Sequence, residues 1–110
     1  MQFDTLEMSL TVLDRVAEVE PKIRAKRKSL ANEIGRAAES IALNVSEGSQ
    51  RAGLDKPDLY RRAAGSARET QAHLRVALAS GWIQPRDVQE ILPLLDRELA
   101  ILWRLTHPRR

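Results

Sequence analysis

The residues with the clearest chemical potential in this chain lie on one ridge of a long helical segment. Ser40, Asn44 and Glu47 are spaced by four and three residues, which places their side chains on one side of a helix. A hydroxyl, an amide and a carboxylate could in principle be arranged for nucleophilic catalysis. They fit better as a structural polar ridge that bonds to Ser66 and Glu69 on the next helix, because polar groups beside a core need partners.

No other pattern indicates an enzyme or a metal centre. There is no Glu-x-x-His pair of the di-iron type and no glycine-rich phosphate loop. His73 and His107 are isolated in the sequence, and the absence of cysteine excludes disulfides and thiolate metal sites. We therefore expect a non-enzymatic protein that needs no metal or cofactor.

Basic residues form a second candidate site, suited to binding phosphates. Arg61, Arg68 and Arg75 repeat every seven residues and so form one line along a helix, which we call the arginine stripe. We expect no aromatic residue to flank this stripe for stacking on bases, and therefore expect contacts to a nucleic-acid backbone rather than base readout. A second cluster, the basic collar, comprises Arg24, Lys26, Arg27 and Lys28. The alternative is that both groups are merely solvated helix surface.

Four amphipathic helices must position these residues. We place them at about residues 5–20, 23–48, 57–80 and 85–106, with turns near Pro21, 51–56 and 81–84. Gly48 is expected to end the second helix, and Pro93 to kink the last one about a turn earlier. The prediction is an all-α protein: a single domain over residues 1–110, folded as an up-down-up-down antiparallel four-helix bundle.

The first and last helices carry more apolar surface than such a bundle needs. On the first helix, the strip that begins at Leu6 and Leu10 is predicted to face the core, which leaves a second apolar strip on another side. We interpret the surplus as an oligomer interface, although one helix touching two neighbours would also explain it. The predicted interface residues are Met8, Val12, Val16, Val19, Leu94, Ile101 and Leu105. Trp82 and Trp103 are expected to be core or interface anchors.

Composition narrows the setting. The first residues lack the basic flank and apolar run of a signal peptide. No stretch approaches the roughly 20 apolar residues of a membrane span. We expect a soluble cytoplasmic protein whose net charge of +3 permits an anionic partner.

Two motifs carry a resemblance to a known family. The chain resembles the four-helix-bundle proteins encoded in intervening sequences of bacterial large-subunit ribosomal RNA, over roughly residues 5–105. Members show Ser-x-x-x-Asn-x-x-Glu-Gly and then Gly-Ser-x-x-Glu on the next helix. The matching residues are Ser40, Asn44, Glu47 and Gly48, followed by Gly65, Ser66 and Glu69. The chain departs from the family at Ala63-Ala64, where a bulkier apolar residue and an arginine are usual.

The resemblance extends to the accessory protein of diversity-generating retroelements. That relative is a basic, barrel-like pentamer that associates with a reverse transcriptase and with nucleic acid. The resemblance thus implies a bacterial homopentamer that binds RNA or DNA, a reverse transcriptase, or both. The alternative is a homo-oligomeric scaffold for a protein partner, without nucleic-acid binding.

Overall fold

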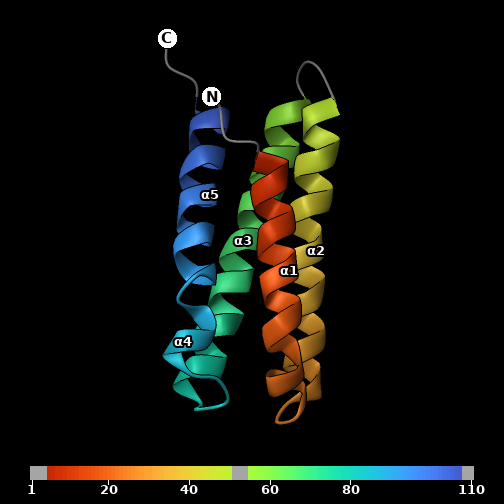
Figure 1. The fold of residues 1–110 in the computed structure, drawn as a ribbon. Coiled ribbons are helices and arrows are strands. Elements are labelled where there is room, and N and C mark those ends of the chain that lie inside the picture. Colours follow the sequence, from red (N-terminus) through yellow and green to blue (C-terminus); the bar gives the residue numbers. More distant parts are fainter. Residues whose placement is uncertain (1–4, 51–54, 108–110) are drawn as a thin grey trace.

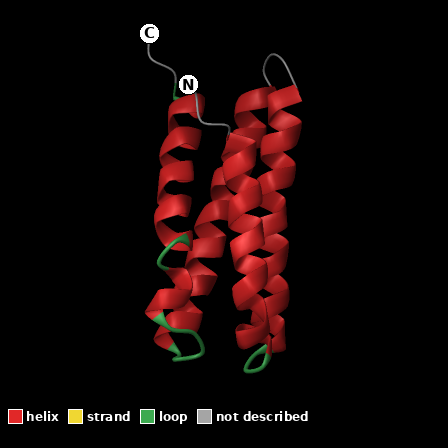
Figure 2. Ribbon diagram, in the orientation of Figure 1, coloured by secondary structure: helices red, strands yellow, loops and turns green. Residues whose placement is uncertain are grey.

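The protein is an elongated bundle of helices. A computed structural model describes residues 5–50 and 55–107, and every regular element in those ranges is helical (Figure 2). The elements are α1 (Thr5–Arg24), α2 (Lys28–Gln50), α3 (Asp55–Ala79), α4 (Pro85–Val88) and α5 (Ile91–Thr106). Successive arms run in opposite directions, with α4 and α5 together forming the fourth (Figure 1). The predicted all-α, four-helix bundle is therefore confirmed.

The helices pack around an aliphatic core. α2 lies between α1 and α3, α3 also packs on α5, and the α1–α5 side has the lightest packing. Aliphatic side chains on facing ridges are fully buried, and removing this apolar surface from water is what drives the helices together. They include Ile23, Ile34, Ile41, Leu74, Ile91, Leu95 and Leu102. None of the helices within the described ranges is long and apolar enough to cross a membrane.

The inward face of α1 is the opposite of the predicted one. Leu10 is 45% exposed, whereas the strip predicted to form an oligomer interface lies in the core of the chain. The buried strip consists of Met8, Val12, Val16, Val19 and Ile23. Assigning its first four members to an intersubunit surface was wrong. Both strips have helical spacing, and the second gains Ile23 only because the helix continues beyond Pro21.

The chain turns later than Pro21. α1 continues to Arg24, and the backbone N–H groups of Ala25 and Arg27 still bond to the carbonyls of Pro21 (3.1 Å) and Ile23 (2.7 Å). Proline lacks an N–H donor, which costs the helix one hydrogen bond without stopping it. The predicted turn at Pro21 was therefore wrong by about one helical turn.

The fourth arm is broken rather than merely kinked. α4 ends at Val88 and α5 begins at Ile91, which places Pro93 in the first turn of α5. A first-turn residue needs no N–H donor, so the break relieves the cost of the proline. The preceding turn occurs where it was predicted, with Gly81 at φ 78°, a conformation that favours glycine.

Gly48 serves packing instead of helix termination. α2 continues to Gln50, and Gly48 is buried inside it. A Cβ atom on Gly48 would lie 2.8 Å from Cε1 of Tyr60, which is closer than two carbons can pack. The absence of a side chain at Gly48 therefore lets α3 approach α2 closely. The predicted loop at 51–56 lies mostly outside the described residues.

Candidate nucleic-acid interface

The arginine stripe runs along the solvent side of α3. Arg61, Arg68 and Arg75 are all exposed, whereas Leu74 on the same helix is fully buried. Successive stripe residues lie about 10.5 Å apart along the axis at a rise of 1.5 Å per residue. Within residues 5–50 and 55–107, none of the three guanidinium groups has a hydrogen-bond or ion-pair partner. The stripe therefore presents uncompensated positive charge to solvent.

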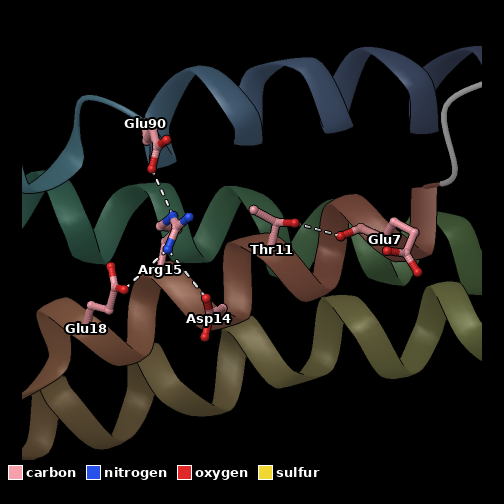
Figure 3. Close-up of polar contacts among 6 residues, drawn as sticks. All are labelled: Glu7, Thr11, Asp14, Arg15, Glu18 and Glu90. Carbon is pink, nitrogen blue, oxygen red and sulfur yellow. Dashed lines mark hydrogen bonds and ion pairs between the residues drawn. The ribbon is translucent and has the colours of Figure 1, made fainter.

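Some other arginines form ion pairs within the chain, and Arg15 is the clearest case. Its Nε atom lies 2.8 Å from Oε1 of Glu90, at the junction of α4 and α5 (Figure 3). Its Nη1 atom also lies 3.4 Å from Asp14 and 3.2 Å from Glu18. Three carboxylates thus surround one guanidinium, which ties α1 to the fourth arm. A guanidinium group paired in this way is not available to an anionic ligand.

The basic collar lies at the turn between α1 and α2. Arg24 donates hydrogen bonds to Glu20 (2.6 Å) and Asn32 (2.7 Å). Arg27 lies over the indole ring of Trp82, 5.5 Å from its centroid, in cation–π contact. Lys26 and Lys28 are exposed. Of the predicted collar, Lys26 and Lys28 are therefore the residues whose charges remain available to a ligand.

One residue of the collar lies beside the last turns of α3. Arg27 lines a surface hollow together with Val76 of α3, the residue after Arg75. Arg61 begins the stripe in the first turns of α3, at the other end of that helix. The structure therefore places Arg27 of the collar beside the last turns of α3, the part of the helix that carries Arg75.

A groove between α3 and α5 contains an aromatic pair that the sequence did not reveal. Arg61, Ala64 and Arg68 line it from α3, and the α5 side supplies Leu99, Trp103, Thr106 and His107. We call it the α3–α5 groove; its volume is about 340 Å³. Trp103 is 56% exposed, and its ring stacks on that of His107 with centroids 4.3 Å apart and planes at 10°.

The expectation that no aromatic residue flanks the stripe was wrong. Trp103 is remote from Arg61 in sequence, but α5 runs antiparallel to α3, which brings its last turns beside the first turns of α3. Trp103 was expected to be a core or interface anchor. In the single chain it is neither buried nor part of the core.

At the α2–α3 contact, hydrogen bonds join three residues of the predicted polar ridge. Asn44 donates from Nδ2 to the Ser40 carbonyl (2.9 Å) and to Ser40 Oγ (3.1 Å). Across the interface, Ser66 Oγ donates to Ser40 Oγ at 2.9 Å. These three side chains are half-buried, whereas Glu47 and Glu69 are exposed. The ridge links two helices and holds no catalytic arrangement of base and nucleophile.

Glu69 joins a different cluster. Its Oε2 lies 3.4 Å from Nε2 of His73, one turn along α3, and Glu33 of α2 approaches both. One ligand atom from each of the three lies within 4.8 Å of the others. The sequence has no Glu-x-x-His pair, but Glu69 and His73 form an i, i+4 pair, a spacing that also suits a metal ion. Glu33 and Glu69 are only partly enclosed, and Arg36 lies 4.0 Å from Glu33.

A buried carboxyl group, which was not predicted from the sequence, lies between α1 and α5. Glu98 of α5 is fully buried, and Ser9 of α1 donates a hydrogen bond to its Oε2. Burial raises the pKa of Glu98 to about 7, and the hydrogen bond from Ser9 partly offsets that rise. The signal was its position between Leu95 and Leu102 on the apolar face of the helix.

The remaining predicted interface residues lie on α5. Leu94 and Ile101 are half-buried, and Leu105 is 40% exposed. Leu10 of α1 adds a further exposed apolar side chain. Together they leave apolar surface on the first and last arms, so assembly remains a prediction.

Fold and surface define a small all-α bundle with one arginine-rich face. A profile of the 23S rRNA-intervening sequence protein family matches residues 1–104, and the chain therefore belongs to that family. No curated protein matched the chain.

A solved structure shares the fold. It is a protein of unknown function from the S23 ribosomal protein family of Bacteroides thetaiotaomicron, similar with a TM-score of 0.84 at 19% sequence identity. The similarity covers 93% of this chain and 97% of the other. At this identity it supports the bundle architecture alone.

Proposed function

We propose that this protein is a non-enzymatic, oligomeric factor that binds the phosphate backbone of RNA or DNA. The observation that carries the proposal is the arginine stripe: Arg61, Arg68 and Arg75 are exposed at heptad spacing and lack ion-pair partners in the described chain. Arginine suits this task because its planar guanidinium can form two hydrogen bonds to a phosphate.

Assembly would multiply the stripe. Along one helix, the 10.5 Å spacing that follows from about 1.5 Å per residue exceeds one phosphate step. A single chain would therefore touch few phosphates, whereas a cyclic oligomer would present a belt of repeated positive charge. The resemblance described above favours a homopentamer and an accessory role beside a reverse transcriptase. Lys26 and Lys28 of the collar would extend the belt near Arg75.

A salt titration tests the proposal. Each phosphate neutralised by arginine releases a counterion, so affinity should fall steeply as salt rises. Replacing Arg61, Arg68 and Arg75 together by Gln should keep the helical circular dichroism spectrum while lowering both affinity and salt slope. The matched control replaces Lys22, Arg36 and Arg62 by Gln, because the charges of these three residues are already paired.

Two results would contradict the proposal. Equal binding by the stripe variant and the wild type across the titration would make the stripe ordinary solvated surface. No binding by the wild type at low salt would favour the second candidate, a homo-oligomeric scaffold for a protein partner. The observation behind that alternative is the exposed apolar side chains, including Leu10, Leu43 and Leu105.

A further inference from the structure

We propose that the α3–α5 groove binds an unpaired base of a single-stranded nucleic acid. Trp103 would stack on the base, and Arg61 and Arg68 would contact phosphates on either side of it. This inference rests on the proposed function and deepens it, because it distinguishes single strands from duplexes.

The aromatic side of the groove is already ordered. Trp103 stacks on His107, and the imidazole is held in turn: its Nδ1 lies 2.9 Å from the Trp103 carbonyl oxygen and 3.1 Å from Thr106 Oγ1. The indole is nevertheless 56% exposed. A large aromatic ring that is held in place and still exposed to solvent is suited to stacking on a base. Little conformational freedom of the side chain remains to be lost on binding.

The basic side of the groove complements a sugar-phosphate backbone. Arg61 and Arg68 lie on the same wall, two helical turns apart, and neither is paired within the described chain. Ala64 lies between them and leaves room where a longer side chain would fill the groove. If a base stacked on Trp103, Arg61 and Arg68 would thus each lie near one of the two neighbouring phosphates.

The positive charge of the α3–α5 groove favours a nucleic acid over an acid-poor peptide or a second apolar helix. None of the groove-lining residues is acidic, and two are arginines. The hollow between α1 and α5 differs, since its Arg15 is paired with Glu90. Duplexes hide base faces within their own stack, so the aromatic pair would add affinity only for unpaired bases.

Fluorescence of Trp103 provides a direct test. The chain has two tryptophans, so Trp82→Phe leaves Trp103 as the reporter. An oligothymidine should quench it, and an abasic strand of equal length and charge should bind about 5- to 150-fold more weakly, as expected for loss of one stacked base. A duplex of the same length should leave the indole fluorescence unchanged.

Variants separate stacking from charge. Trp103→Ala, made in the wild-type chain and measured by fluorescence anisotropy of labelled strands, should reduce oligothymidine affinity to that of the abasic strand. Abasic binding and its salt dependence should stay unchanged. Trp103→Phe should restore part of the preference, and Leu43→Ala, which removes an exposed apolar side chain of α2 outside the groove, should have no effect.

The outcomes distinguish this inference from the proposed function. Equal binding of oligothymidine and abasic strands, with no quenching, would overturn base stacking and leave phosphate binding intact. Failure of every strand to bind would remove both. A drop in molecular mass on light scattering for Trp103→Ala would assign Trp103 to a subunit contact and overturn the inference.

Discussion

Ser9 of α1 and Glu98 of α5 meet in the interior, where the Ser9 hydroxyl donates a hydrogen bond to Oε2 of Glu98. Both residues are completely buried, and Oε1 of Glu98 has no hydrogen-bond partner among the described residues. The contact joins α1 and α5, the neighbouring arms whose mutual packing is lightest. A carboxyl group so placed favours its neutral form, because burying the charge without a cation is costly.

Stability should therefore depend on the protonation of Glu98. Its pKa rises from an ordinary 4.5 to about 7 in the fold, so the folded state holds the extra proton between those values. The stabilising contribution is complete below pH 4.5 and is lost as pH rises through 7, by up to about 3 kcal/mol. Glu98→Gln should remove this slope and melt above wild type at pH 8. Chemical unfolding at pH 5 and pH 8 measures the difference, and parallel pH profiles for the two proteins would contradict it.

Two glycines of α2 form a matched pair. Gly48→Ala would bring a Cβ atom to 2.8 Å from the Tyr60 ring, whereas Gly35 has no atom within 4 Å of the same position. Gly35→Ala should stabilise the protein by about 1 kcal/mol through helix propensity. Gly48→Ala should instead destabilise it, because shifting the buried ring costs about 1–3 kcal/mol. Equal stabilisation of both variants in thermal unfolding would show that Tyr60 yields freely.

The polar ridge predicts a third effect on stability. Asn44→Leu removes both bonds to Ser40 and leaves the half-buried Ser40–Ser66 pair beside an apolar side chain. The expected loss is about 1–3 kcal/mol. Leu43→Ala, at the exposed neighbouring position, is the control and should change stability little. If both variants melt with the wild type, Asn44 contributes nothing to the α2–α3 contact.

Periodicity was enough to predict the bundle and part of its core. Ile34, Ile41 and Leu74 face inward as expected, because each lies on a helix with one dominant apolar face. The same reasoning failed on α1, where two apolar strips compete and the choice depended on whether Pro21 ends the helix. The spacing of apolar residues within one helix cannot show which of two such faces is buried, because that depends on packing against the other arms.

The sites were less predictable because they depend on contacts between helices. The spacing alone predicts the arginine stripe, but the closeness of Arg61 and Arg68 to Trp103 depends on how α5 restarts after the break before Pro93. Glu98 had the spacing of a core residue. Because a charged side chain is rarely buried, Glu98 was not predicted to be a core residue.

The last prediction concerns assembly. Leu10 and Leu105 are 45% and 40% exposed on the first and last arms, and exposed apolar side chains of this size favour association. Light scattering should therefore give a multiple of the 12.4 kDa chain mass, with five copies expected from the family resemblance. Leu10→Glu or Leu105→Glu should lower that mass while circular dichroism stays helical, because a buried unpaired carboxylate opposes the contact. A wild-type monomer at micromolar concentration would exclude the oligomer, whereas a dimer would exclude only the pentamer.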